Sequence, residues 1–498
     1  MNIIINISII SSILTALLIF EDCLKLYQET HYNLKVYISK IIKYYKKYFL
    51  YLFIYFPFSN LWYVSLINIT VSLLVLIKYV NKKTIKHLKF TTRILRQCIV
   101  IGALIFSIKY IYKDLTNILT LTNFIAYLLV FVSGIILLPI ESLIRQYYRN
   151  KSKSKIKKFN PFVIGITGSC GKTSIKNYLY AILNSKYNCY ITPKSYNTIN
   201  GISLTINNLL KHEDALFILE MGASKKNDIK QIVNYIKPNI AIVSEITNQH
   251  INTFKNIETI LEEKMKIIEN MDSDGVGYIN YDNKYIQNYV FKNVHKIVKC
   301  GTSRDCDCYA YNIKHTLKGL EFSIKYRNIE FDISTKLVGI HNVNNLCISI
   351  AIAIDMGITI DTLKSILEEI SNHEHRLEIK ETKSLTIIDD SYNSNPIGFL
   401  NALDVLDLAE NKRILITPGI VDCGKMEYEI NYGLAKKISE VCDEVILVSN
   451  QSSQHIKKGL DDLGYTKYKI VTNFKEAISL VNEGTLLIEN DLTDGYFI

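Results

Sequence analysis

The stretch that decides the fold reads Phe162-Val-Ile-Gly-Ile-Thr-Gly-Ser-Cys-Gly-Lys-Thr-Ser174. A short apolar strand runs into a turn with two glycines, and a helical pattern follows at 174–183. In such a strand, loop and helix, glycines let backbone N–H groups converge on phosphate oxygens, and the helix dipole strengthens the attraction. A lysine then reaches the β- and γ-phosphates, and a threonine hydroxyl binds magnesium. We therefore predict a phosphate-binding loop made of Gly168, Ser169, Cys170, Gly171, Lys172, Thr173 and Ser174.

The loop departs from the strict form of the motif at one position. That form requires a glycine where this chain has Ile166. The alternative interpretation is a solvated turn with an incidental lysine. Because a strand and a helix flank the loop as the motif requires, we favour the phosphate loop.

Strand-like and helical patterns alternate after the loop. Such alternation predicts a parallel sheet covered on both faces, and in such sheets ligands gather at the carboxyl ends of the strands. Glu220 follows one strand pattern, and the polar run 244–250, which ends at His250, follows the next. A carboxylate and an imidazole in one crevice can hold a divalent cation. The strand patterns are 215–219, 239–243 and 277–280, and a helical pattern covers 257–268.

The first third of the chain differs from the rest in charge and hydropathy. Residues 1–158 hold 22 Lys and Arg against 5 Asp and Glu, whereas residues 159–498 hold 36 against 42. Uncharged stretches at 1–20, 48–77 and 115–140 match or exceed the ~20 residues that cross a bilayer, and 97–108 is a shorter one. Residues 1–20 lack a basic start and a small-residue cleavage site, so we interpret them as an anchor rather than a secretory signal.

Three basic segments, 25–47, 78–96 and 145–158, alternate with these apolar stretches. The positive-inside rule places all three in the cytoplasm, so 48–77 should enter the bilayer and return, as two short spans or as a re-entrant or tilted hairpin. We expect a multi-pass cell-membrane protein with cytoplasmic catalytic domains and the lipid bilayer, not a nucleic acid, as partner. The ten cysteines should be reduced thiols.

Nine blocks of sequence resemble those of the Mur ligase family, in the family's order, from Phe162 to about Val421. The family's shorter signature, Gly-x-x-Gly-Lys-[ST], also accommodates Ile166. Within the family, the likeness is greatest to the branch that adds D-alanyl-D-alanine to a muramoyl peptide. The blocks are Gly168-Ser-Cys-Gly-Lys-Thr173, Asn197-Thr-Ile-Asn-Gly201, Leu219-Glu-Met-Gly222, Ile246-Thr-Asn-Gln-His250, Lys264, Asn280-Tyr-Asp282, Gly339-Ile-His-Asn342 with Asn345, Arg376-Leu-Glu378, and Asp389-Asp-Ser-Tyr-Asn-Ser-Asn-Pro396.

The resemblance implies a ligase that uses ATP to convert a carboxylate into an acyl phosphate, which an amine attacks to give an amide, ADP and phosphate. It implies two magnesium ions, the second supported by a carbamylated Lys264. The implied catalytic residues are Lys172, Lys264, His250 and Arg376, and the implied metal site comprises Thr173, Glu220, His250 and Lys264. The implied nucleotide-side residues beyond the loop are Asn280, Asp282, His341, Asn342, Asn345, Arg376 and Asp390. The implied substrate residues are Asn197, Thr198, Asn200, Asn393 and Asn395.

Taken without the resemblance, several of these residues have simpler interpretations. Lys264 would lie on a solvated helix face, Asn342 and Asn345 would mark the start of an apolar helix over 343–356, and Asn197 to Asn200 would form a turn. An asparagine at a helix start can serve both roles.

We predict an α/β protein in three parts. Residues 1–158 form a transmembrane anchor of helices with cytoplasmic basic segments, residues 159–370 a central P-loop, ATP-binding α/β domain, and residues 371–498 a Rossmann-like C-terminal α/β domain. In the last part, strand patterns at 385–388, 413–417, 444–448 and 486–488 are separated by helical ones.

The expected function is amide-bond formation on a cell-wall peptidoglycan precursor, with an amino acid or dipeptide as the incoming amine. Soluble members of the family begin with a domain that binds the UDP-sugar, and here the anchor takes that position, so the precursor is expected to be lipid-linked or unusual. The alternatives are a membrane-linked polyglutamate-type ligase and a non-catalytic membrane nucleotide-binding regulator. A transporter would require ionisable residues inside the long apolar stretches, which contain none.

Overall fold

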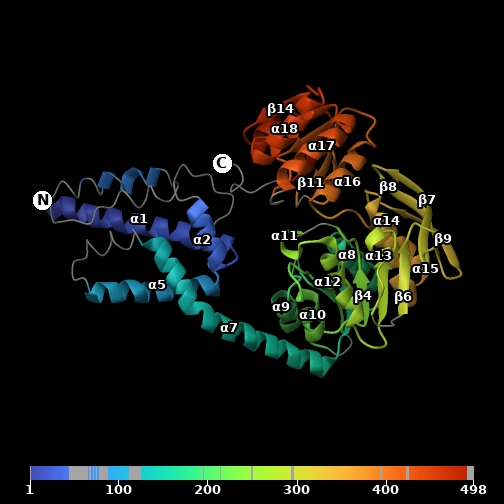
Figure 1. The fold of residues 1–498 in the computed structure, drawn as a ribbon, viewed down its shortest axis with the longest axis horizontal. Coiled ribbons are helices and arrows are strands. Elements are labelled where there is room, and N and C mark those ends of the chain that lie inside the picture. Colours follow the sequence, from blue (N-terminus) through green and yellow to red (C-terminus); the bar gives the residue numbers. More distant parts are fainter. Residues whose placement is uncertain are drawn as a thin grey trace. The chain divides into compact units, whose positions relative to one another are not determined.

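The computed structural model describes residues 2–43, 88–111 and 125–490, with gaps at 194–195, 213–214, 248–250, 293–295, 393–394 and 422–425, and a few positions between 66 and 77 (Figure 1). The chain divides into two compact units, Met1–Tyr147 and Tyr148–Ile498, which are described separately below. Much of the predicted apolar stretch 48–77 and the beginning of 115–140 lie outside the described residues.

The described part of the first unit is helical. Two of its helices are long and apolar enough to cross a membrane by length and composition, over Asn6–Glu29 and Ala126–Phe159. The buried side chains include Cys23, Tyr27, Tyr37 and Ile94. The helices are α1 (Asn2–Glu29), α2 (Leu34–Lys43), α5 (Thr92–Ile111) and α7 (Ala126–Phe159), the last of which continues into the second unit.

The second unit contains two sheets, and the larger one holds the strand that precedes the predicted phosphate loop. Its order is β2-β3-β1-β4-β5-β6-β7-β8-β9, and its strands are parallel from β2 across to β7. The parallel strands before β7 are β1 (Phe162–Thr167), β2 (Asn188–Ile191), β3 (Ala215–Glu220), β4 (Ile240–Val243), β5 (Val276–Asn280) and β6 (Lys296–Gly301).

Helices cover both faces of this sheet, as predicted. Ile164 and Ile166 of β1 pack with α8 and α14, whereas Val163, which precedes them and faces the other side of the sheet, packs with α9, α10 and α12. These two apolar layers explain why the central strands are buried along their length. The helices are α8 (Lys172–Leu183), α9 (Ile199–Leu209), α10 (Asp228–Tyr235), α11 (Ile251–Phe254), α12 (Ile257–Glu269), α13 (Lys284–Gln287), α14 (His341–Asp355) and α15 (Ile360–Glu369).

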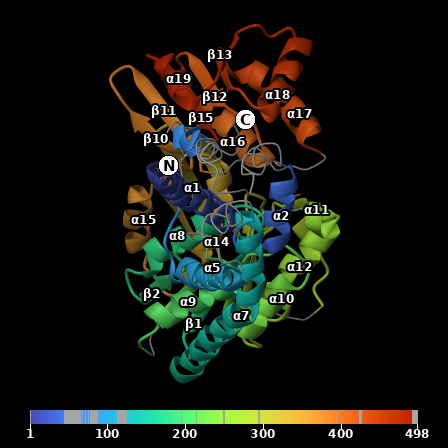
Figure 2. The ribbon, with the colours of Figure 1, turned by 90° about the vertical axis from the view of Figure 1, so that its left-hand side faces the viewer.

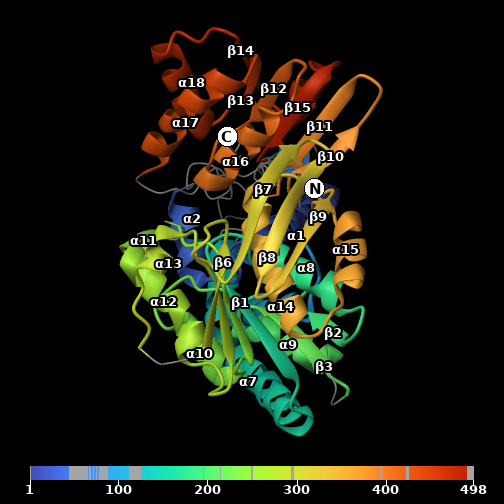
Figure 3. The same cartoon turned by 90° about the vertical axis from the view of Figure 1, so that its right-hand side faces the viewer.

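An antiparallel extension at one edge of the sheet was not predicted. It consists of β7 (Cys308–Thr316), β8 (Gly319–Tyr326) and β9 (Ile329–Thr335), of which β9 lies beside α15 (Figure 3). Buried and more exposed residues alternate along these strands, as they do when one face of a sheet meets a core and the other meets water.

The smaller sheet lies in the C-terminal part and has the order β10-β11-β15-β12-β13-β14, with only β10 antiparallel to its neighbour. Helices α17 and α18 pack side by side (Figure 2). The strands are β10 (Glu378–Glu381), β11 (Leu385–Asp390), β12 (Arg413–Thr417), β13 (Glu444–Val448), β14 (Tyr468–Val471) and β15 (Gly484–Glu489). The helices are α16 (Pro396–Leu406), α17 (Glu427–Val441), α18 (Gln451–Asp462) and α19 (Phe474–Ser479).

Candidate active site

The predicted phosphate loop joins β1 to α8, and two of its glycines adopt backbone angles that favour glycine. The φ angles are +151° at Gly168 and +81° at Gly171. A Cβ atom at Gly168 would collide with the Ser244 hydroxyl, and one at Gly171 would lie 2.6 Å from Asn345 Oδ1. Both positions therefore admit only glycine, because their φ angles are positive and the side chains of Ser244 and Asn345 occupy the space that a Cβ atom would need.

Two lysine amines meet at this loop. The Nζ atom of Lys172 donates to the carbonyl oxygens of Gly168 and Ser169, at 2.5 and 2.9 Å. Lys264, which α12 presents from the other side, donates to the same Gly168 oxygen at 2.8 Å and is only 4% exposed. Burial lowers the pKa of Lys264 well below its usual value, and the positive charge of Lys172 adds to that effect. The structure thus brings Lys264 to the loop rather than to a solvated helix face.

Glu220 ends β3 beside the loop, where its carboxylate forms a buried ion pair. Glu220 lies opposite Ile166 in the β1–β3 register. Its Oε1 atom is 2.7 Å from the Nζ atom of Lys176, and both side chains are 2% exposed. Lys176 also donates to the Thr192 carbonyl at 2.9 Å. Sequence reasoning missed Lys176, although it lies one helical turn after Lys172 and therefore on the same helix face.

Glu245, after β4, is a second carboxylate that sequence reasoning did not single out. Its carbonyl accepts from the Ser169 N–H at 2.6 Å, so it holds the loop directly. Its carboxylate accepts from Nδ2 of Asn280, at 2.7 Å, and from Nδ2 of Asn283. Burial raises the pKa of Glu245. The pattern that drew attention to Glu220, an acid just after an apolar strand, is also present at Glu245.

The start of α14 packs against the start of α8. Tyr178 donates to Asn342 Oδ1 at 2.9 Å, and Asn342 donates to the Val338 carbonyl at 2.8 Å. Asn345 adjoins Gly171. The Nδ1 atom of His341 is buried without a hydrogen-bond partner among the described residues, and burial lowers the pKa of this imidazole to about 4.

Residues from the C-terminal part also approach the loop. The charge of Arg376 contributes to the lowered pKa of Lys172, although burial is the larger cause, and the guanidinium lies 4.5 Å from the ring centroid of Tyr392. Asn395 caps α16 by accepting from the Gly398 N–H at 3.0 Å, and Cys170 Sγ lies 3.9 Å from Asn395 Oδ1.

Two other predicted nucleotide-side residues, Asp390 and Asp282, form hydrogen bonds to neighbouring groups of the protein. Asp390 accepts from the Leu377 N–H at 3.2 Å and is hydrogen-bonded to Glu489, and burial raises the pKa of Asp390 to about 6. The Asp282 carboxylate accepts from the N–H and hydroxyl groups of Thr302 and so holds the turn after β6. His250 and Asn393 lie outside the described residues.

One further cluster of possible metal ligands is already neutralised. His375, Glu378 and Asp389 have ligand atoms within 4.8 Å of one another. However, the Nζ atom of Lys380 is 3.0 Å from both carboxylates, so an ammonium group occupies the place of a cation.

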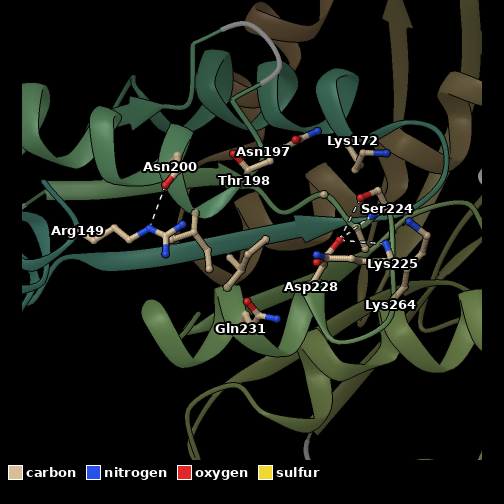
Figure 4. A pocket seen from close by; sticks show the side chains of 14 residues that line it. Arg149, Lys172, Asn197, Thr198, Asn200, Ser224, Lys225, Asp228, Gln231 and Lys264 are labelled. Carbon is tan, nitrogen blue, oxygen red and sulfur yellow. Dashed lines mark hydrogen bonds between the residues drawn. The ribbon is translucent and has the colours of Figure 1, made fainter. Parts of the chain in front are cut away.

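A pocket of about 400 Å³ begins at the two lysines of the loop. Figure 4 shows Lys172 and Lys264 at one end and Arg149 at the other. Asn197 packs against Gly222, Thr198 caps α9, and the Arg149 Nε donates to Asn200 Oδ1 at 3.0 Å. The predicted substrate residues Asn197, Thr198 and Asn200 therefore share one cavity with the loop, and Arg149 was not foreseen. The lining residues are Arg149, Lys172, Asn197, Thr198, Ile199, Asn200, Gly222, Ala223, Ser224, Lys225, Asp228, Gln231, Ile232 and Lys264.

Comparison with known proteins agrees with these features. Residues 166–353 match the Mur ligase middle domain, and residues 375–488 match the Mur ligase, glutamate ligase domain. The chain is 32% identical over 270 residues to the UDP-N-acetylmuramoyl-tripeptide–D-alanyl-D-alanine ligase of Buchnera aphidicola subsp. Baizongia pistaciae, covering 53% of this chain and 58% of that protein. The ligase of the same name from Haemophilus influenzae is 26% identical over 324 residues, covering 64% of this chain and 70% of the relative.

The fold is also that of a solved relative. The MurF ligase of Thermotoga maritima, determined in complex with ADP, superimposes with a TM-score of 0.62 at 22% identity, over 70% of this chain and 80% of that one. The matched region thus spans a little over half the length of the first relative and most of the solved structure.

Proposed function

Because this chain belongs to the Mur ligase family, we propose that it is an ATP-dependent ligase that joins an amino acid or dipeptide to the carboxyl group of a peptidoglycan precursor. One observation carries the proposal. The amines of Lys172 and Lys264 meet at the Gly168 carbonyl, at one end of a pocket large enough for part of a peptide. A carboxylate bound there would lie beside the loop that fits a triphosphate.

The loop fits a nucleotide for a structural reason. Gly168 and Gly171 have the positive φ angles that favour glycine in such a loop, and the N-terminus of α8, whose N–H groups attract anions, follows directly. Bound ATP supplies the phosphoryl group that makes a carboxylate electrophilic. The chain's part is positioning and charge neutralisation, with Lys172 and Arg376 on the phosphates. We assign the base side to His341, Asn342 and Asn345, with Asn280 nearby, and the ribose to Asp390.

Magnesium would be held by residues of mixed character. Thr173, Glu220 and His250 offer oxygen and nitrogen donors, and the Glu220 carboxylate, which is paired with Lys176, would exchange that partner for the ion. We propose that Lys264 is carbamylated and supports a second ion. The burial of Lys264 and its closeness to Lys172 disfavour a second ammonium group, and a neutral amine is the form that adds carbon dioxide.

The substrate class follows from the relatives' names and from the pocket. The relatives are named for joining D-alanyl-D-alanine to a UDP-N-acetylmuramoyl tripeptide. We propose the same chemistry here, with Asn197, Thr198 and Asn200 along the acyl substrate and Asn393 and Asn395 on the side of the incoming amine. Polar amides and hydroxyls suit a peptide because they match its donors and acceptors.

We further propose that the enzyme works at the inner face of the cell membrane on a lipid-linked precursor. The support is the apolar character of α1 and of the first part of α7, together with the basic segments beside them. In this arrangement the chain is multi-pass and its catalytic domains are cytoplasmic. Tethering would raise the effective concentration of the active site near a bilayer-borne substrate.

The test uses the full chain in lipid nanodiscs with magnesium and ATP. Muramoyl tripeptide, linked either to UDP or to a lipid diphosphate, is supplied with D-alanyl-D-alanine, and ADP release and the amide product are both measured. We expect substrate-dependent ADP release that Lys172→Ala lowers by at least 100-fold. No product from either acyl substrate, or full turnover by Lys172→Ala, would contradict the proposal. Polyglutamate products from added glutamate would favour the alternative ligase.

A further inference from the structure

The last turns of α7 form hydrogen bonds with α9 and α10. The Ser152 hydroxyl lies 2.9 Å from the Ser203 hydroxyl of α9 and is hydrogen-bonded to the Tyr235 hydroxyl of α10. Lys155 Nζ donates to the carbonyls of Asn207 and Leu210, at 2.7 and 3.0 Å. These carbonyls lie at the carboxyl end of α9, where the last carbonyls of a helix have no partner within the helix, so the Lys155 amine satisfies them. This part of α7 is thus a fixed element of the second unit.

This fixed helix places Arg149 at the end of the pocket away from the phosphate loop (Figure 4). The Nε atom of Arg149 donates to Asn200 Oδ1 at 3.0 Å, and the Arg149 carbonyl accepts from the Tyr235 hydroxyl at 3.3 Å. A guanidinium carries five N–H donors in a planar fork, so one bond to an amide leaves it capable of binding an anion with two parallel hydrogen bonds.

The charges that line the pocket also favour an anion at this end. Four lining residues are basic, and one, Asp228, is acidic. The Asp228 carboxylate accepts from the N–H groups of Ser224 and Lys225, at 2.9 and 3.0 Å, and so is used in the turn before α10. Arg149 therefore has no carboxylate partner within the pocket lining, and its Nε atom donates to the neutral amide of Asn200.

We propose that Arg149 binds a second anionic group of the acyl substrate, a carboxylate or a phosphate, while the reacting carboxyl lies beside Lys172 and Lys264. This inference rests on the function proposed above and adds a specificity-determining residue to it. It makes the preferred substrate a molecule with two separated negative charges, because each end of the pocket presents basic side chains.

The position of Arg149 in the chain gives the inference a link to the membrane. Leu143, in the apolar part of α7, is six residues before Arg149, so at most about 22 Å of chain separates them. A substrate held at a bilayer surface could therefore reach Arg149 with its phosphates. A soluble substrate could equally present a peptide carboxylate, so the experiment includes both sources.

The experiment compares wild type, Arg149→Gln, Arg149→Lys and Lys157→Gln as full chains in nanodiscs. Lys157 is an exposed base on the same helix and serves as the matched control. Steady-state kinetics are measured with the lipid-linked tripeptide, the UDP-linked tripeptide, a tripeptide amidated at its non-reacting carboxylates, and a muramoyl tripeptide without phosphate. Thermal melting checks that each variant folds.

With each acyl substrate that carries the anion bound by Arg149, Arg149→Gln should raise the KM for that substrate by at least 10-fold. The change in kcat should be smaller, and the KM for ATP should not change. Arg149→Lys should recover part of the affinity, and Lys157→Gln should match wild type. The effect should vanish with the amidated tripeptide if the anion is a carboxylate, and with the phosphate-free one if it is a phosphate. An equal KM change with every substrate, or none with any, would overturn the inference.

If the wild type turns over no substrate, the proposed function fails but Arg149 is still tested by binding. Calorimetric titration of the UDP-linked tripeptide should then show at least 10-fold weaker binding to Arg149→Gln than to wild type and Lys157→Gln. Equal affinities across the three chains would contradict the role of Arg149 itself.

Discussion

Lys172 and Lys264 donate hydrogen bonds to the same oxygen atom, the carbonyl of Gly168, at 2.5 and 2.8 Å. Two amines that share one neutral acceptor cannot both carry a proton without repulsion, and burial adds to the penalty. The arrangement is unfavourable for folding but suited to a ligand with several negative charges. We therefore expect a bound anion to relieve the repulsion between the two amines and to stabilise the fold.

The first prediction follows from that relationship. Lys264→Met should raise the free energy of unfolding by about 1 to 2 kcal/mol and abolish amide formation, because a methionine fills the space without a buried amine. The Gly168 carbonyl keeps its bond to Lys172. Urea unfolding in buffer free of carbon dioxide, where Lys264 is the unmodified amine, measures the first effect, and product assays with bicarbonate present measure the second.

The pH dependence gives this prediction its sign. The pKa of Lys264 is lowered in the folded chain, so between that value and the usual ~10.4 the unfolded chain binds more protons. Wild-type stability should therefore rise with pH in that window relative to Lys264→Met. A variant less stable than wild type near neutral pH, or one that keeps turnover, would contradict the prediction.

A second prediction concerns the cradle. Gly171→Ala should weaken ATP binding by at least 10-fold, because its Cβ would lie 2.6 Å from Asn345 Oδ1 and its φ of +81° disfavours side chains. Gly171→Ala with Asn345→Ala should relieve the collision but not the backbone strain. We expect calorimetry to show that the double variant binds ATP more tightly than Gly171→Ala does, but more weakly than Asn345→Ala does. Complete recovery would show that strain plays no part.

Much of the fold was predictable from sequence because buried parallel strands are continuous apolar runs. The strand patterns at 413–417 and 444–448 coincide with β12 and β13, and 215–219 falls one residue short of β3. The antiparallel strands β7 to β9 were not predicted, because their half-buried alternation lacks so clear a signal.

The site was predictable only where a residue lies in a motif or directly after a strand. The loop lysine and Glu220 meet that condition. The partner of Glu220, Lys176, and the pocket residue Arg149 do not, because ion pairs and pocket walls depend on contacts between distant segments. Lys264 shows the opposite case: its helix pattern indicated solvent, whereas packing placed it 4% exposed at the loop.

The third prediction concerns the buried pair of Lys176 and Glu220. Lys176→Met should destabilise the fold by about 3 to 5 kcal/mol, because it leaves the carboxylate buried without its cation. The double variant Lys176→Met with Glu220→Leu should be much more stable than Lys176→Met alone, because neither side chain then places a charge in the protein interior. A double-mutant cycle by urea unfolding measures the coupling. Additive effects of the two substitutions would contradict it.

The last prediction concerns Asp390, whose pKa burial raises to about 6. The unfolded carboxyl titrates near ~3.9, so between pH ~4 and ~6 the folded chain binds more protons than the unfolded chain. Stability should therefore fall as pH rises through that window. Asp390→Asn removes this titration. The free energy of unfolding of the variant, relative to that of wild type, should therefore increase by about 2 kcal/mol from pH 4 to pH 7. The exposed Asp361→Asn is the control. Urea unfolding midpoints measured across this range should converge for wild type and Asp390→Asn at the acid end, and parallel profiles would contradict a raised pKa at this carboxyl.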